Sequence, residues 1–153
     1  MKKSFLLRLM NFWPPYLGAG VRVKNMSKDM THIEVEMKLR FWNKNYVNTH
    51  FGGSLYSMVD PFYMLMLMEN LGREYIVWDK AATIRFENPG RGRVHAIFDL
   101  NQEQIQKLRH EVDIAGKIEP HFNVEILDDN NVLIAVVDKT IYIRRKDAVK
   151  PSL

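Results

Sequence analysis

In the segment 32–42, apolar and polar side chains alternate strictly as far as residue 41. Ile33, Val35, Met37, Leu39 and Phe41 take every second position, and His32, Glu34, Glu36, Lys38 and Arg40 lie between them. A period of two predicts a strand with one buried face. Similar apolar segments predict further strands over residues 21–24, 76–86, 93–100, 122–127 and 132–144. Turn residues over 25–29, 88–90 and 128–131 lie between successive pairs, so we expect antiparallel hairpins there.

The segment between the second and third of these strands has the pattern of a helix. Over residues 52–72, apolar side chains point in every direction around a helical axis, which predicts burial on all sides. About twenty residues rise ~30 Å, so this helix would cross a domain whose radius of gyration is near ~15 Å. Shorter amphipathic helices are expected over residues 1–16 and over 101–117. The first is expected to pack on the body, with a membrane-surface anchor as the alternative.

One long helix enclosed by a curved antiparallel sheet of about six strands is the α+β architecture called the hot-dog fold. Such a sheet wraps only part of the helix. The apolar surface that is left predicts a second protomer, so we expect a homodimer or a dimer of dimers.

The composition agrees with one ordinary domain over residues 1–153, because 46% of the residues are hydrophobic and 26% are charged. The chain has no cysteine, which excludes disulfides, thiolate metal sites and cysteine nucleophiles. A reducing compartment, and hence a cytoplasmic location, is expected. No apolar run reaches the ~18 residues of a transmembrane helix.

The net charge of +4 lies mostly at one end of the chain. Residues 144–153 form a basic tail in which Arg144, Arg145, Lys146 and Lys150 stand against Asp147 alone. No helix carries a stripe of lysine and arginine. We therefore expect no nucleic-acid partner.

Asp60 is the only charged side chain between Gly53 and Met68. A charge in an apolar helix is expensive unless it is paired, hydrated or used. Pro61 follows and predicts a kink. Asp60 could cap a second helical segment that has Pro61 in its first turn. Alternatively, it is a catalytic carboxylate that Ser57, one turn away, orients.

Several motifs carry a resemblance to a known family. They are Asn45, Asn48-Thr49, Gly52-Gly53, Asp60 seven residues later, and Asn-Pro-Gly-Arg-Gly-Arg over residues 88–93. With the order of elements around them, the region 17–142 resembles hot-dog acyl-CoA thioesterases of the phenylacetyl-CoA thioesterase type. It looks most like the subgroup described as tetrameric acyl-CoA thioesterase-like.

The resemblance implies roles for these residues. Asp60 matches the carboxylate that acts as a nucleophile or activates water. Gly52 and Gly53 match the helix-start glycines whose N–H groups polarise the thioester carbonyl, and Asn45 matches an asparagine near the thioester. The family usually has histidine where this chain has Phe51, and glycine where it has Asn48. His50, one position earlier, is the candidate substitute for that histidine.

Spacing constrains how such a site could be assembled. Eight helical residues between Gly52 and Asp60 rise ~12 Å, which is too far for both to act on one carbonyl. Two antiparallel helices in a two-fold dimer would instead set Asp60 of one protomer against Gly52 and Gly53 of the other. The resemblance implies the same arrangement.

Further residues are candidates for binding the rest of an acyl-CoA substrate beside Asn48 and Phe51. Arg85, Arg91 and Arg93 suit the phosphates of coenzyme A, although an ordinary solvated strand face explains them equally well. Tyr63 could line an acyl pocket, with core packing as the alternative. Coenzyme A is expected only as part of the substrate. The five histidines show no paired spacing, so no metal site is predicted.

Other chemistries fit less well. A serine hydrolase needs Gly-x-Ser-x-Gly, and Tyr56 breaks that motif. A hot-dog dehydratase using His50 with Asp60 stays open. The alternative from another class is a non-catalytic acyl-CoA or lipid-binding module, which Phe51 favours.

Overall fold

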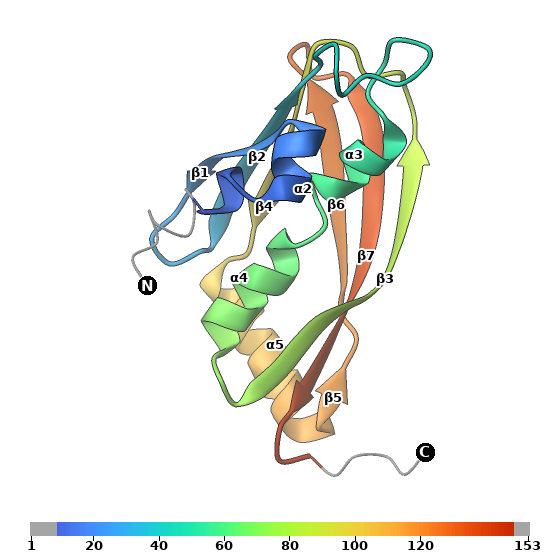
Figure 1. Ribbon diagram of the computed structural model, residues 1–153. Coiled ribbons are helices and arrows are strands. Elements are labelled where there is room, and N and C mark those ends of the chain that lie inside the picture. The colour runs from blue at the N-terminus through green and yellow to red at the C-terminus, as the bar shows by residue number, and fades with distance from the viewer. Residues whose placement is uncertain (1–8, 149–153) are drawn as a thin grey trace.

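The computed structural model describes residues 9–148 and contains a seven-stranded antiparallel sheet (Figure 1). The strands run in the spatial order β1-β2-β4-β6-β7-β3, and the short β5 pairs with β7. Their bounds are β1 Val21–Met26, β2 His32–Lys38, β3 Tyr75–Phe86, β4 Arg93–Asp99, β5 Lys117–Ile118, β6 His121–Asp128 and β7 Leu133–Arg145. The six predicted strands are present, and β5 was not predicted. β2 is shorter than its pattern, because the chain leaves the sheet after Lys38.

Two of the three predicted hairpins are confirmed. β1 pairs with β2 and β6 pairs with β7, both antiparallel. The expected hairpin of β3 and β4 around Asn88-Pro89-Gly90 is wrong. The 12-residue β3 pairs along its whole length with the 13-residue β7, whereas the shorter β4 lies between β2 and β6. The ladder with β7 satisfies more backbone groups of β3 than a seven-residue partner could.

The predicted central helix is broken into α3 (Gly52–Ser57) and α4 (Phe62–Leu71). The break coincides with Pro61, which has no N–H to continue the helical ladder. Asp60 does not cap α4, since Pro61 takes the N-cap position and no side chain bonds there. Burial on all sides is also wrong for α4, because Met68 is 48% exposed.

The remaining helices differ in how well the sequence predicted them. α5 (Gln102–Ala115) begins at Asn101 with a capping box and ends at Gly116, within the predicted range. Of the predicted helix over 1–16, residues 1–8 lie outside the described part. Residues 9–11 are helical, and a separate helix, α2 (Pro14–Ala19), then begins with proline in its first turn. Arg144 and Arg145 of the predicted basic tail belong to β7, and residues 149–153 lie outside the described part.

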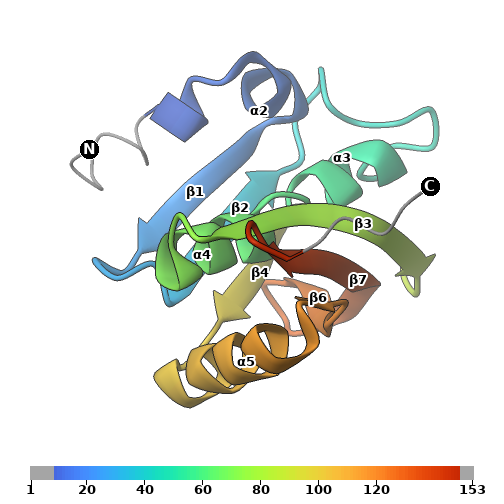
Figure 2. The same cartoon turned by 90° about the horizontal axis from the view of Figure 1, so that it is seen from below.

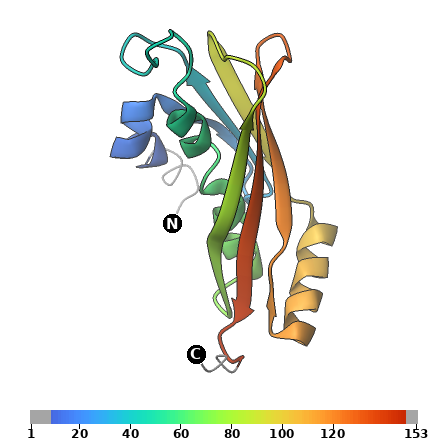
Figure 3. The ribbon, with the colours of Figure 1, turned by 90° about the vertical axis from the view of Figure 1, so that its right-hand side faces the viewer.

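The helices cover the sheet unequally. Figures 2 and 3 show α2 and α3 on one side of the sheet and α5 on the other. Arg109 of α5 donates hydrogen bonds to the carbonyls of Asn70 and Leu71, which fixes α5 to the end of α4. Among the described residues, no helix is both long and apolar enough to cross a bilayer.

Candidate functional site

Asp60 lies in the turn between α3 and α4, and its side chain is 47% exposed. The Tyr56 hydroxyl donates a 2.7 Å hydrogen bond to Oδ1 of Asp60. The Nζ of Lys139 lies 3.4 Å from the same oxygen and also donates to the Asp60 backbone carbonyl. The carboxylate is thus held by a hydroxyl and an ammonium group while part of it faces solvent.

Lys139 is the unusual residue of this cluster, because its side chain is fully buried. It takes an inward position on β7 between Val137 and Ile141, both of which belong to the core. Its Nζ lies 2.7 Å from Oδ1 of Asp79 on the neighbouring strand β3, at an angle unfavourable for a hydrogen bond. A buried ammonium is tolerated only when it is paired and hydrogen-bonded. Two aspartates and a carbonyl supply those partners.

The surroundings alter the acidity of the groups around Asp60. Burial raises the pKa of Asp79 above its ordinary value, although Lys139 opposes this shift. Burial also raises the pKa of Tyr56, and its hydrogen bond to Asp60 adds to the effect. Burial, followed by the charge of Asp60, raises the pKa of Tyr16 on α2. Both tyrosines are therefore neutral hydroxyls at physiological pH.

Ser57 does not orient Asp60 as predicted. Its hydroxyl donates a 2.8 Å hydrogen bond to the carbonyl of Gly53, one turn back along α3. Tyr56, which precedes it, bonds the carboxylate instead. A serine in a helix readily bonds the carbonyl four residues earlier, and here this bond takes the hydroxyl away from Asp60.

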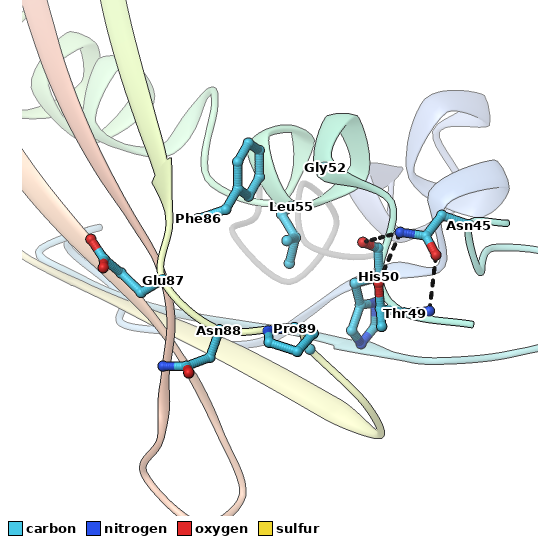
Figure 4. A pocket seen from close by; sticks show the side chains of 10 residues that line it. Asn45, Thr49, His50, Gly52, Leu55, Phe86, Glu87, Asn88 and Pro89 are labelled. Atoms are coloured by element: carbon cyan, nitrogen blue, oxygen red, sulfur yellow. Dashed lines mark hydrogen bonds between the residues drawn. The ribbon is translucent and has the colours of Figure 1, made fainter. Parts of the chain in front are cut away.

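A cavity of about 360 Å³ lies at the other end of α3, where the helix begins (Figure 4). Its walls come from the loop before α3, from α3 itself and from the segment after β3. The lining residues are Asn45, Thr49, His50, Gly52, Leu55, Phe86, Glu87, Asn88, Pro89 and Gly90. Three predicted site residues, Asn45, His50 and Gly52, therefore meet at one cavity.

The loop before α3 is organised by Asn45. Its Oδ1 accepts from the backbone N–H groups of Val47 and Thr49, and its Nδ2 donates to Oγ1 of Thr49 at 2.8 Å. Asn48 follows with a φ of 62°, a conformation that favours glycine and that asparagine tolerates. Its Oδ1 accepts from Lys44 at 2.6 Å. Asn45 and Asn48 thus shape the loop that supplies one wall of the cavity, although only Asn45 lines it.

His50 is buried in this wall. One ring nitrogen, Nε2, lies 2.9 Å from the carbonyl oxygen of Gly92, and Nδ1 has no partner within the described residues. The carbonyl can only accept, so Nε2 carries a proton and donates it. Burial lowers the pKa of His50. The neutral ring therefore leaves Nδ1 as an unused acceptor.

Gly52 and Gly53 allow two aromatic rings to approach the start of α3. A Cβ atom on Gly52 would lie 2.8 Å from the ring of Phe86, and one on Gly53 would lie 2.7 Å from the ring of Phe51. The glycine pair therefore has a packing reason that is independent of its predicted role. Within α3, the first N–H groups have no intrahelical acceptor.

Asp60 follows the end of α3, whereas the cavity lies at the start of that helix. Asp60 is absent from the cavity lining, and its cluster lies beside a second hollow, of about 390 Å³, lined by Tyr56, Asp79, Lys80, Ala81, Ala82 and Ile84. Within one protomer, His50 and Asp60 do not line a common cavity. One chain therefore does not bring together the two groups that the dehydratase alternative needs.

The arginines predicted to bind phosphate differ in their surroundings. Arg85 pairs with Asp138 at 2.5 Å, and Arg93 pairs with Asp129 at 2.9 Å. Arg91 is exposed and has no ion pair within the described residues. Of the three, only Arg91 leaves its guanidinium unpaired.

Tyr63 is in the core. It is 7% exposed, and its ring stacks on Phe122 with centroids 4.4 Å apart. This placement corresponds to the core-packing alternative. In the described part of the chain, no three acidic or histidine side chains gather closely enough to hold a metal ion.

Sequence reasoning missed Lys139, Asp79 and Tyr56. A signal for Lys139 was present, because inward positions of β7 read Ala135, Val137, Lys139, Ile141 and Ile143. A lysine in an apolar alternation predicts a buried partner. Asp79 has the same kind of signal beside Val77. Nothing in the sequence paired Lys139 or Asp79 with Asp60, since β3 was not expected beside β7.

Solved structures identify the class of fold. A protein of unknown function from Pseudomonas aeruginosa, described as a probable thioesterase, has a TM-score of 0.85 at 17% identity, over 95% of this chain and 97% of that chain. A thioesterase from Haemophilus influenzae has a TM-score of 0.66 at 15% identity, over 98% of both chains. A variant thioesterase from Staphylococcus aureus has 0.61 at 16%, over 84% and 97%. The predicted hot-dog fold is confirmed.

The sequence also identifies a family. Residues 1–143 match the family model described as a domain of unknown function, DUF4442. The chain belongs to this family. No functionally curated protein matches it.

Proposed function

We propose that this protein is a thioesterase that hydrolyses acyl-CoA, with Asp60 as its catalytic carboxylate. The observation that carries the proposal is the placement of Asp60. It is half-exposed at the break of the hot-dog helix, and Tyr56 and buried Lys139 hold it in position. Three structures of the same fold, described as thioesterases or a probable thioesterase, support the reaction class.

The chemistry follows from the groups that meet the thioester. As a base, Asp60 takes a proton from water while the water oxygen attacks the carbonyl carbon. The free N–H groups at the start of α3 donate to the oxyanion that forms. The carbon–sulfur bond then breaks, and the coenzyme A thiolate takes up a proton as it leaves. As a nucleophile, Asp60 would instead form a mixed anhydride that water hydrolyses.

The proposed site is shared between two protomers. β3 is an edge strand whose outer backbone groups have no partner within the described chain, and such an edge is a template for pairing. Asp79 marks the part of β3 beside Asp60, and Phe86 marks the part beside Gly52. Antiparallel pairing of two β3 strands about their middle would bring these two parts together across the interface. Asp60 of one protomer would then face Gly52 and Gly53 of the other.

Arg91 is the arginine best suited to the phosphates of coenzyme A. It lies in the turn after the cavity-lining segment 86–90, and no carboxylate within residues 9–148 pairs with it. Arg85 and Arg93 would first have to leave Asp138 and Asp129.

The second candidate function is an acyl-CoA or lipid-binding module without turnover. The observation that favours it is the close approach of the Phe51 and Phe86 rings to Gly53 and Gly52. These rings crowd the helix start that would have to receive an oxyanion.

Hydrolysis of a panel of acyl-CoA thioesters, followed by thiol release, separates the two functions. We expect turnover by the wild type and a loss of at least about a hundredfold in Asp60→Asn. Asp113→Asn, a carboxylate on α5, is the matched control and should keep wild-type activity. Tight acyl-CoA binding without turnover in the wild type would contradict the thioesterase and support the binding module.

A further inference from the structure

The loop between β2 and α3 exposes large apolar side chains. Phe41 is 83% exposed, Trp42 52%, Tyr46 101% and Val47 65%. A run of this kind on one short loop is unusual for a surface that meets only water. Contiguous exposed apolar surface marks a site of interaction.

Helix α2 extends the same surface. Phe12, Trp13 and Leu17, on or next to α2, are 71%, 49% and 53% exposed. The loop is anchored to this helix, because Nδ2 of buried Asn43 donates to the carbonyl of Ala19 at 3.0 Å. Figures 1 and 3 place α2 and the loop at the same end and on the same side of the molecule. We call these seven side chains, Phe12, Trp13, Leu17, Phe41, Trp42, Tyr46 and Val47, the aromatic surface.

The charged side chains on the segments that carry the aromatic surface are all positive. Lys38 at the end of β2 and Arg40 and Lys44 in the loop are exposed, and no acidic residue occurs between Glu36 and Asp60. Nor does any acidic residue precede Asp29 in the chain. The Arg40 guanidinium lies over the Trp42 ring at 5.2 Å, and Lys44 bonds Asn48. Within residues 9–148, none of the three cations has a carboxylate partner.

We propose that the aromatic surface docks on a membrane that contains anionic phospholipid. Tryptophan and tyrosine are favoured at the boundary between headgroups and acyl chains, and phenylalanine, leucine and valine would enter the apolar side of that boundary. Lysine and arginine beside them match the negative headgroups. An anionic membrane thus accounts for both the apolar side chains and the positive charges of the surface.

Two other partners fit the surface less well. A second copy bound through the same surface in a two-fold contact would set Lys38, Arg40 and Lys44 against their own equivalents. Single-stranded nucleic acid is held in a basic groove whose aromatic rings stack on bases. Here the loop projects from the molecule, as Figure 3 shows, and aliphatic side chains interrupt the rings.

The docked orientation would bring a ligand site close to the bilayer. The loop that carries Tyr46 and Val47 also supplies Asn45, Thr49 and His50 to the cavity at the start of α3. A ligand with a long acyl chain would thus reach the cavity from the lipid phase. Docking itself does not depend on the proposed thioesterase reaction.

The test is co-sedimentation of the full chain with vesicles. One set contains phosphatidylcholine alone, and the other contains equal parts of phosphatidylcholine and phosphatidylglycerol. We expect binding to the anionic vesicles and weakening by salt, because screening acts on exposed charges. The double variant Phe41→Ser/Tyr46→Ser should bind roughly tenfold more weakly or worse. Arg40→Gln and Lys44→Gln should each cost about fivefold on anionic vesicles only.

Ile114→Ser is the matched control, since Ile114 on α5 is 74% exposed and lies away from the aromatic surface. It should bind as the wild type does. Equal binding of the double variant and the wild type, or no binding to anionic vesicles, would overturn the proposal. A double variant that changes only the oligomeric state would assign the surface to a second copy. Loss of oligonucleotide binding in that variant, without vesicle binding by the wild type, would assign it to nucleic acid.

Discussion

The ammonium group of Lys139 contacts Asp60 twice, once at its carboxylate and once at its backbone carbonyl. Lys139 is on β7, and Asp60 is in the turn between two helices, so this contact joins the sheet to the break in the hot-dog helix. Asp79 on β3 forms an ion pair with the same ammonium group. The position of the candidate catalytic group is therefore tied to a charge inside the core.

Replacing Lys139 should test how much its ion pairs with Asp60 and Asp79 stabilise the fold. Lys139→Met keeps the volume but leaves the partly buried Asp79 without a counter-charge, so we expect a loss of about 1–3 kcal/mol in the free energy of unfolding. The double variant Lys139→Met/Asp79→Asn should recover part of that loss, because it removes the unpaired charge. Urea denaturation measures both. Additive losses in the double variant would argue against the pairing.

His50 and His32 should make the free energy of unfolding depend on pH, His50 below pH 6.5 and His32 above it. The pKa of buried His50 is lowered from 6.5, so its contribution is fully present above pH 6.5 and is lost as pH falls through its folded pKa. Hydrogen bonds to Asp99 and Glu34 raise the pKa of His32. Its contribution is fully present below pH 6.5 and is lost as pH rises through the raised pKa.

Stability curves for His50→Gln and His32→Gln separate these effects. His50→Gln should flatten the fall in stability below pH 6.5 and leave the slope of the curve above pH 6.5 unchanged. His32→Gln should flatten only the fall in stability above pH 6.5 and leave the slope below it unchanged. If either variant altered the opposite window, the assignment of that histidine would be wrong.

The exposed edge at β3 should make the protein associate. Sedimentation at micromolar concentration is expected to give a dimer or a dimer of dimers. Ala82→Asp places a charge on the exposed part of β3 and should weaken the association at least tenfold, because like charges would face each other across a two-fold contact. Ile97→Asp on β4, which is also exposed, serves as the control. A wild-type monomer would rule out the shared site.

Two glycines should respond in opposite ways to the same substitution. A Cβ atom at Gly90 would lie 3.0 Å from both His50 and Ile134, so Gly90→Ala should cost about 1–3 kcal/mol. Gly18 lies in α2 with no atom within 4 Å of its Cβ position, and Gly18→Ala should stabilise the protein by about 0.5–1 kcal/mol. Thermal unfolding of both variants measures the difference. Equal effects would mean that crowding at the cavity wall is not what requires Gly90.

The sequence was informative where a pattern is local. Apolar patterns located the six longer strands, and the amphipathic pattern over residues 101–117 located α5. Asp60 was noticed because it is charged in an apolar segment. The pairing of β3 with β7 was not predictable, since a turn signal such as Asn88-Pro89-Gly90 does not tell a hairpin from a crossover. The partners of Asp60 depend on that pairing, so Lys139 and Asp79 emerged only from the three-dimensional structure.

The break at Pro61 also divides the hot-dog helix into two helices of unequal local stability. Both helices are shorter than an isolated helix needs, but α3 has only six residues, whereas α4 has ten and packs through Phe62, Met66 and Leu67. Amide protons of α3 should therefore exchange with solvent long before those of α4. A ligand held at the start of α3 would slow this exchange, so deuterium uptake over residues 52–57 offers a way to screen for ligands without knowing the reaction.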